Sequence, residues 1–286
     1  MPYEIIITKE FDGVKPKNFL KKTLDIPFFK VIDFIRDKRI TLNGKKIKKD
    51  DVLRTGAVIK VWKDDIKLRE VKKEFREMKD LNIPIVFESD DFMVLNKPSG
   101  VIVQGAQDNS TSLSLHLAWY KNQINDKSDF EYFHVHRLDK ETSGALVVAK
   151  NGQTLRELNR VFRDRGVAKK YICLCSGEFE EKRGKVEVFL ERTPQEVREK
   201  VKVVKKKTLK AKRSLSFYKV IKEFEYKDEV FSLVEVEIKT GVTHQIRVHM
   251  KHLGHPIVGD KMYGNSAINR KFEGKLDRQF LHASFI

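Results

Sequence analysis

Cysteine is scarce in this chain of 286 residues, which contains only Cys173 and Cys175. A small extracellular scaffold held together by disulfides is therefore excluded. The two cysteines flank Leu174 in a predicted strand, and we expect their side chains to point to opposite faces and not to form a disulfide. Their expected role is that of buried apolar side chains in a reducing compartment.

Long apolar runs are also missing. No stretch of 18 apolar residues occurs, which excludes a transmembrane helix. The first residues, Met-Pro-Tyr-Glu-Ile-Ile-Ile, lack the basic and then apolar pattern of a secretion signal, so we expect a cytoplasmic protein. An apolar fraction of 40% still provides a sizeable core, and the length suits two domains or one large one.

Acidic residues are too few to balance the basic ones. The chain has 41 Asp and Glu against 58 Lys and Arg, which gives a net charge of +17, and its pI is near 9.6. Residues 15–62 alone carry 14 basic and 5 acidic side chains. Such a field favours a polyanionic partner, above all nucleic acid. The alternative is a general Lys and Glu enrichment that serves solubility or thermal adaptation.

The N-terminal part has the pattern of two short helices and a small sheet. Asn18 is expected to cap the first helix. The second helix is predicted over residues 28–38 after Pro27, which suits a first helical turn. Its apolar residues follow the spacing of one buried face: Phe28, Val31, Ile32 and Ile35. Strands are predicted before the Asn43-Gly44 turn and over residues 58–62.

This segment resembles an S4 domain, a small RNA-binding fold. The resemblance rests on Phe19-Leu20, the second helix, Leu42-Asn43-Gly44 and Leu53-Arg54-Thr55-Gly56, and it departs from the usual Arg-Leu-Asp opening, which here is Pro16-Lys17-Asn18. It implies an RNA-binding domain over residues 1–65. The basic residues that it offers to RNA phosphates are Lys15, Lys17, Lys21, Arg36, Lys38 and Arg39.

Residues 66–80 are dense in Lys and Glu and predict a solvated linker. A second domain is expected over residues 81–286, where the alternating apolar pattern of a mixed, mainly antiparallel sheet dominates. Few helices separate the strands, which favours an α+β fold. Predicted strands cover residues 85–87, 92–95, 101–103, 145–149, 170–175, 185–190, 214–221 and 230–239, and predicted helices cover 112–122 and 152–164.

Residues 136–144, His-Arg-Leu-Asp-Lys-Glu-Thr-Ser-Gly, form a polar segment directly before the apolar run 145–149. The apolar run predicts a buried strand, and a polar loop at the end of a rigid strand is a frequent place for chemistry. Considered alone, Arg137 and Asp139 are more simply explained as an ordinary surface ion pair.

Two further polar segments lie later in the chain. Gly241 ends a strand, and Thr243 is expected to cap a helix whose buried stripe contains Ile246, Met250 and Leu253. Residues 198–213 contain nine Lys or Arg and a single acidic residue. Such a block forms a solvated loop or hairpin arm, and beside an RNA site it would bind phosphates.

Taken together, these segments are similar to the RluA family of pseudouridine synthases over essentially the whole chain. The matching blocks occur in family order at residues 95–100, 136–144, 169–171, 241–249 with 254–264, and, more weakly, 280–283. Family members usually continue beyond this point, so we expect an exposed sheet edge near Ile286.

The resemblance implies that uridine in RNA is isomerised to pseudouridine without a cofactor. The N1–C1′ bond breaks, the base turns, and C5 bonds to C1′. The family aspartate matches Asp139, and whether it adds covalently or removes the 2′ proton stays open. Arg247 matches the arginine that pairs with this carboxylate, and Tyr171 matches the tyrosine over the base, where it can stack and assist proton removal from C5.

The target uridine must be flipped out of the RNA stack to reach such a site. Arg137 matches a family residue that fills the vacated space, His136 is expected to shape the loop, and Lys169 joins them as an RNA contact. Large-subunit ribosomal RNA is the expected substrate, transfer RNA is the alternative, and the protein is expected to be a monomer.

Asp139 and Tyr171 also have purely structural alternatives. Asp139 could belong to a structural ion pair, and Tyr171 could be an ordinary core residue of a strand. Four histidines, His244, His249, His252 and His255, suggest zinc, but no helix face aligns three of them with a carboxylate, so no metal is expected. The rival functions are a non-catalytic RNA-binding protein on the same fold and a metal-dependent RNA hydrolase.

Overall fold

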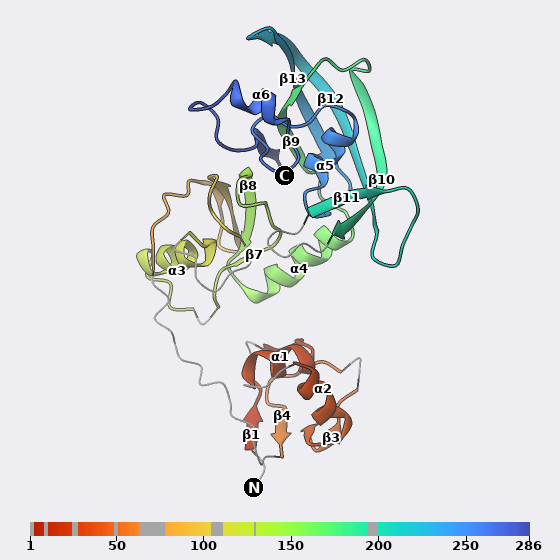
Figure 1. Ribbon diagram of the computed structural model, residues 1–286. Helices are drawn as coiled ribbons and strands as arrows, with labels where there is room; N and C mark the ends of the chain where they lie inside the picture. Colours follow the sequence, from red (N-terminus) through yellow and green to blue (C-terminus); the bar gives the residue numbers. More distant parts are fainter. Residues whose placement is uncertain are drawn as a thin grey trace. The chain divides into compact units, whose positions relative to one another are not determined.

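The chain forms two compact units in the computed structural model. The structure describes residues 3–8, 11–24, 28–48, 51–62, 78–103, 111–128, 130–193 and 200–286. One unit comprises Met1–Met78 with Lys127–Phe130, and the other comprises Lys79–Asp126 with Glu131–Ile286 (Figure 1). Pro27 and most of the predicted linker, residues 66–77, lie outside the described residues.

The first unit contains the predicted two helices and small sheet. Its helices are α1 (Pro16–Thr23) and α2 (Phe28–Arg36). Its sheet has the order β1 (Tyr3–Ile6), β4 (Val58–Val61), β2 (Ile40–Leu42), β3 (Lys45–Lys46). The core between them is formed by apolar side chains that are shielded from water, among them Leu20, Leu24, Val31, Ile40, Leu53 and Ile59.

Two details of this unit differ from the prediction. Helix α1 begins earlier than expected, with Pro16 in its first turn and Lys15 rather than Asn18 at the N-cap. Proline suits that position because its missing N–H would have no helical partner there. Ile32 is 42% exposed, whereas Val31 is fully buried. Neighbouring helical residues point about 100° apart, so the buried stripe of α2 is narrower than its apolar pattern suggested.

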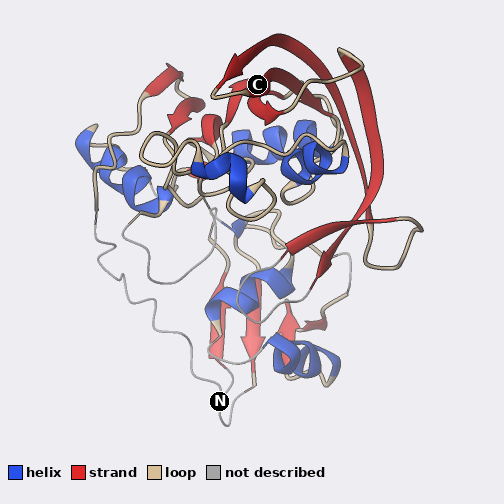
Figure 2. Cartoon of the chain, turned by 45° about the horizontal axis from the view of Figure 1, so that its top comes forward, coloured by secondary structure: helices blue, strands red, loops and turns tan. Residues whose placement is uncertain are grey.

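The second unit is built on one large, mainly antiparallel sheet (Figure 2). Its order is β11 (Lys200–Val204), β10 (Arg183–Thr193), β12 (Lys212–Tyr226), β13 (Glu229–Ile238), β9 (Lys170–Ser176), β14 (Leu281–Phe285), β8 (Ser143–Ala149), β6 (Phe92–Lys97) and β5 (Ile85–Glu88), with β7 (Phe133–His134) on β8. Among the described strands only β8 and β14 pair in parallel. The prediction of a mixed, mainly antiparallel sheet is confirmed.

Four helices accompany this sheet in the described part of the chain. They are α3 (Leu113–Gln123), α4 (Gly152–Arg163), α5 (Gln245–His252) and α6 (Ser266–Arg270). The first three match the helices expected from the apolar spacing. No helix of the described residues is long and apolar enough to cross a membrane.

Residues 101–103 do not form the predicted strand. Among the described residues, an isolated bridge joins Ile102 to Ser112. The Gly100 amide donates to the Lys140 carbonyl (3.0 Å), and the Val101 carbonyl accepts from the Lys97 ammonium (3.0 Å). The exposed edge expected near Ile286 is also wrong, since β14 lies between β9 and β8.

The two cysteines correct another expectation. Cys173 and Cys175 are two positions apart on β9 and therefore point to the same face of the sheet, because side chains alternate with a period of two. Their Sγ atoms lie 3.7 Å apart, and both are free thiols buried in the core. Burial raises the pKa of the Cys175 thiol, so it remains protonated.

A close approach of backbones fixes the centre of the sheet. Gly144 on β8 has a φ of +115°, and a Cβ atom there would lie 2.2 Å from the carbonyl oxygen of Ala283 on β14. Only glycine fits both the conformation and the space. The loop before β8, residues 135–142, lines a cavity together with Tyr171 on β9 and Leu281 on β14.

Candidate active site

The loop before β8 carries Asp139 and is held through its backbone. The ammonium of Lys97, which is completely buried, donates to the carbonyls of Pro98, Val101 and Lys140 at 2.8–3.0 Å. Burial lowers the pKa of Lys97 to about 8, although the charges of Glu141 and Asp139 oppose this shift. The loop is thus supported by hydrogen bonds made before any substrate arrives.

Helix α5 supplies the second half of the site. Gln245 in its first turn donates to the Leu215 carbonyl (3.0 Å) and the Ser216 hydroxyl (2.9 Å) on β12. These bonds fasten the helix to the sheet. The predicted cap at Thr243 is wrong: His244 is the N-cap residue, with a left-handed φ of +56°. The Thr243 hydroxyl instead accepts a hydrogen bond from Arg192 (2.9 Å).

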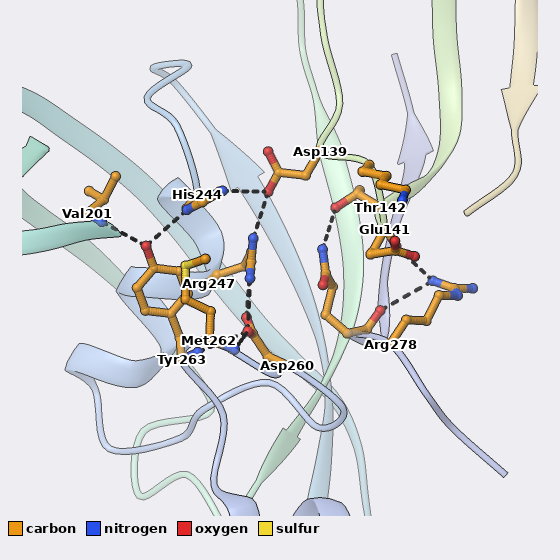
Figure 3. A network of polar contacts seen from close by, with 12 residues as sticks. Asp139, Glu141, Thr142, Val201, His244, Arg247, Asp260, Met262, Tyr263 and Arg278 are labelled. Carbon is orange, nitrogen blue, oxygen red and sulfur yellow. Dashed lines mark hydrogen bonds and ion pairs between the residues drawn. The ribbon is translucent and has the colours of Figure 1, made fainter. Parts of the chain in front are cut away.

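Arg247 on α5 bridges two carboxylates (Figure 3). Its Nε and Nη2 donate to the two oxygens of Asp260 at 2.7 and 2.9 Å, and its Nη1 donates to Oδ2 of Asp139 at 3.2 Å. Asp260 is only 1% exposed and also accepts from the backbone amides of Met262 and Tyr263. A guanidinium held at Nε and Nη2 has its plane fixed, and this sets the direction in which Nη1 donates to Asp139.

Asp260 and Arg247 stabilise each other's ionised forms although both side chains are buried. Burial by itself would raise the pKa of Asp260, but the hydrogen bonds and charge of Arg247 outweigh it and the pKa is lowered. For Arg247 burial acts in the opposite direction, and the carboxylates of Asp260 and Asp139 keep its pKa above the usual value.

A second contact reaches Asp139 from His244. Its Nε2 lies 3.9 Å from Oδ2 of Asp139, and its Nδ1 lies 2.9 Å from the Tyr263 hydroxyl (Figure 3). Burial lowers the pKa of His244 more than the Asp139 charge raises it, so the ring is neutral near pH 7. The Tyr263 oxygen accepts the amide of Val201 (2.8 Å) and can donate to Nδ1, which leaves the Nε2 proton facing the carboxylate.

Both contacts involve the same oxygen of Asp139. Within the described part of the chain, Oδ1 makes no hydrogen bond, and it belongs to a side chain that lines a small cavity of about 110 Å³. A wider hollow of about 670 Å³ adjoins it and shares Arg137, His244 and Arg247. One carboxylate oxygen is thus held by Arg247 and faces His244, while the other makes no hydrogen bond in the described part of the chain.

The structure brings four predicted residues together around this cavity: Arg137, Asp139, Tyr171 and Arg247. Tyr171 on β9 is 7% exposed. Burial, reinforced by the Asp139 charge, raises its pKa, so the hydroxyl is protonated in the free protein. The Tyr171 ring can cover a base. For its hydroxyl to take part in accepting a proton, the bound substrate would have to change this environment.

The other predicted contacts lie elsewhere. His136 turns its Nε2 to the amide of Val147 (3.1 Å) and stacks on Phe162, and burial lowers its pKa to about 3. Lys169 lies over the same Phe162 ring, 5.7 Å from its centroid. Neither lines the cavity. The first unit carries the rest of the predicted contacts, all exposed: Lys17, Lys21, Arg36, Lys38 and Arg39.

Sequence reasoning did not assign roles to Asp260, His244 and Tyr263. The available signal was the segment Gly-Asp-Lys-Met-Tyr-Gly at residues 259–264, whose aspartate and tyrosine are the ones that meet Arg247 and His244. Among the described residues no group of three metal-ligating side chains occurs. His249 and His255 instead contact Ser214 and Phe179.

A mixed sheet with few helices, on which a loop aspartate pairs with a helix arginine, is the arrangement that the sequence blocks predict for a pseudouridine synthase. The sequence profile of the family described as RNA pseudouridylate synthase matches residues 91–252. The chain belongs to this family, and it is therefore an isomerase that acts on uridine in RNA. The prediction of a pseudouridine synthase from the ordered blocks is confirmed.

Particular relatives cover nearly the whole chain. Ribosomal large subunit pseudouridine synthase C of Buchnera aphidicola subsp. Schizaphis graminum is 33% identical over 99% of this chain and 88% of its own length. The protein of the same name from Escherichia coli K12 is 31% identical over 98% of this chain and 86% of its length. The solved structure of human RNA pseudouridylate synthase domain containing 1 is 31% identical with a TM-score of 0.59, covering 71% of this chain and 76% of that one.

Proposed function

We propose that this enzyme converts uridine to pseudouridine in large-subunit ribosomal RNA, with Asp139 as the residue that acts on the flipped nucleotide. The observation that carries the assignment is the cavity in which one oxygen of Asp139 is bound by Arg247, while the other makes no hydrogen bond among the described residues. The names of the relatives from Buchnera and Escherichia coli support the ribosomal substrate. Such a substrate supports a cytoplasmic location.

Asp139, Arg247 and Tyr171 take separate roles in this proposal. The N1–C1′ bond of the flipped uridine breaks, the uracil turns, C5 bonds to C1′, and the proton lost from C5 is balanced by one gained at N1. Arg247 keeps Asp139 ionised and oriented beside the sugar and base. The Tyr171 ring covers the uracil while it turns, and water is kept out of the cavity.

We further propose that residues 1–65 are an S4-like RNA-binding domain, joined by the linker 66–80 to a catalytic domain over 81–286. The two helices, the four-stranded sheet and the separate core of the first unit support this division. A hollow of about 210 Å³ lies there between Lys15, Lys17, Lys48 and apolar side chains of α2. Exposed ammonium groups around a hollow suit a phosphate backbone.

The test is to incubate the protein separately with unmodified large-subunit rRNA and with unmodified transfer RNA, and to map pseudouridines in both. The proposal predicts new pseudouridines at one or a few positions of the ribosomal RNA and none in transfer RNA. Modification of transfer RNA alone would overturn the substrate while leaving the chemistry intact. No modification of either RNA by correctly folded protein would contradict the assigned site.

A further inference from the structure

The loop between β11 and β12, residues 205–211, carries a concentration of positive charge. It contains Lys205, Lys206, Lys207 and Lys210, all exposed, and no acidic residue. None of these lysines forms an ion pair with a carboxylate in the part of the chain that the structure describes. Arg213, two residues beyond the loop, is paired with Glu187 at 2.6 Å. The loop stands out beyond the strands that it joins (Figure 2).

Thr208 braces the tip of this loop. Its hydroxyl donates to the Glu191 carboxylate on β10 (2.5 Å) and accepts from the backbone amides of Lys210 (3.3 Å) and Ala211 (3.1 Å). The Ala211 amide also approaches the Thr208 carbonyl at 3.3 Å. These bonds close a turn with Leu209 in its second position, so the direction of that side chain is set by the backbone.

Leu209 is fully exposed, at 107% of its reference area. A single exposed apolar residue is ordinary on a protein surface. Here, however, the residue lies between Lys207 and Lys210, on a turn whose Thr208 hydroxyl is bonded to Glu191. An apolar side chain displayed among exposed ammonium groups fits a partner with a charged backbone and apolar faces, which is the chemistry of RNA.

The loop is also tied to the active site through its neighbours. Glu191, which holds Thr208, is followed by Arg192, whose guanidinium donates to the hydroxyl of the cavity-lining Thr243 (2.9 Å). Val201, near the other end of the basic segment, donates to Tyr263 beside His244. As neighbours on a strand, Glu191 and Arg192 point to opposite faces of the sheet. The loop therefore borders the sheet next to the strand residue that contacts the cavity lining, and an RNA that extends from the cavity past this border would meet it.

We propose that residues 205–211 are an RNA contact in which the lysines hold phosphates and Leu209 inserts as a wedge between neighbouring bases. The inference rests on the proposed RNA substrate. Wedging by an apolar side chain partly unstacks a base step and so assists the extrusion of a nearby uridine. The phosphate contacts position the wedge and carry no sequence preference.

The test uses the full-length protein and a synthetic RNA hairpin with a uridine-rich loop, with 2-aminopurine placed at the step that closes the loop. The fluorescence of 2-aminopurine rises when it is unstacked. Leu209→Ala removes the wedge and retains every charge, and Leu209→Met restores an apolar side chain of similar length. Ile221→Ala, at a β12 position that is 51% exposed, is the matched control for truncation of a surface aliphatic residue.

The wild-type protein and the Leu209→Met variant are expected to raise the fluorescence on binding, and Leu209→Ala is expected to lose most of this rise and to bind roughly tenfold more weakly. Ile221→Ala should behave like the wild type. An equal rise with Leu209→Ala, or no rise with the wild type, would overturn the wedge. Lys206→Ala combined with Lys207→Ala should reduce the slope of log K against log[salt] by roughly 2, and an unchanged slope would overturn the phosphate contacts.

The test of the Leu209 wedge is independent of the test of the proposed function. The fluorescence and binding measurements need no turnover, whereas pseudouridine mapping on ribosomal RNA measures turnover directly. If mapping succeeds and Leu209→Ala leaves both fluorescence and affinity unchanged, only the wedge is refuted. If mapping fails while the hairpin is still unstacked by Leu209, the proposed ribosomal substrate or the assigned site is refuted and the wedge is retained.

Discussion

At the scale of single residues, the site depends on one guanidinium shared by two carboxylates. Asp260 is buried and accepts from Nε and Nη2 of Arg247, which fixes the plane of the guanidinium and directs Nη1 toward Asp139. We therefore expect Asp260 to act as a positioning residue for Asp139. A buried ion pair contributes little net stability when intact, but the loss of one partner leaves an uncompensated buried charge.

Asp260→Asn tests this arrangement. The substitution keeps the shape of the side chain and leaves Arg247 without its buried counter-charge, so the free energy of unfolding should fall by about 3 kcal/mol. The rate of pseudouridine formation under saturating RNA should fall as well, because Asp139 loses its oriented partner. Asp90→Asn, at an exposed position in the turn between β5 and β6, is the control and should change neither quantity. Full activity of the Asp260→Asn variant would contradict the positioning role.

His249 on α5 is expected to make stability depend on pH. Its Nε2 donates to Ser214, its Nδ1 is buried without a partner in the described part of the chain, and burial lowers its pKa to about 4. In the unfolded chain its pKa is about 6.5. The unfolded state therefore binds the proton first, and the stability present above pH 6.5 is lost as the pH falls toward 4.

His249→Gln, which retains a donor for Ser214, should flatten the pH dependence of unfolding. Its slope between pH 6.5 and 4 should be smaller than that of the wild type by up to about 1.4 kcal/mol per pH unit, the contribution of one proton. Urea unfolding at several pH values provides the measurement. His252→Gln, at an exposed position whose charge is the smaller cause of the lowered His249 pKa, should change the slope only slightly. Parallel curves for His249→Gln and the wild type would exclude a neutral buried ring at this position.

At the scale of secondary-structure elements, the junction of β8 with β14 positions the loop that carries Asp139. Gly144→Ala would place a Cβ atom 2.2 Å from the Ala283 carbonyl and strain a φ of +115°. We expect a loss of at least about 3 kcal/mol in the free energy of unfolding. Gly274→Ala, with a φ of +75° and no atom within 4 Å of the added Cβ, isolates the conformational strain and should cost about 1–2 kcal/mol.

Thermal or chemical unfolding of both variants distinguishes the two causes. Equal losses for Gly144→Ala and Gly274→Ala would mean that the close approach of the strands is unimportant. A larger loss for Gly144→Ala, accompanied by lost activity, is the predicted result.

The sequence predicts elements well where one face of a strand or helix is buried. Strands β6 and β13 alternate buried and more exposed residues, as their apolar periodicity predicted. Prediction from the sequence fails where a side chain outside the element determines the course of the backbone. Residues 101–103 have the sequence pattern of a strand. The Val101 carbonyl instead accepts a hydrogen bond from the Lys97 ammonium, as do carbonyls nearby, and the segment forms no regular strand.

At the scale of the whole molecule, the active site combines residues that are far apart in the chain. Asp139 and Arg247 are separated by 108 positions, and their pairing was predicted only through the family motifs. Asp260 and Tyr263 lay in a motif with no assigned role because hydrogen bonds between distant loops leave no periodicity in a sequence. The contact between Val201 and Tyr263, 62 positions apart, had no sequence signal at all.

The net charge is +17, and we expect basic side chains in more than one part of the chain to contribute to RNA binding. Deletion of residues 1–65 should weaken binding to structured RNA and reduce the magnitude of its salt slope, because fewer counterions are released. Filter binding at several salt concentrations provides both quantities. Lys17→Gln combined with Lys21→Gln in the full-length protein should move the slope in the same direction by a smaller amount. An unchanged slope after the deletion would show that the first unit does not contact RNA.

The proposed function requires Asp139 to perform the isomerisation and not to serve binding alone. Asp139→Asn should abolish tritium release from ribosomal RNA labelled at uridine C5, while the affinity for the same RNA stays within a few-fold of the wild type. Tritium release from the Asp139→Asn protein at a rate near that of the wild type would contradict this role.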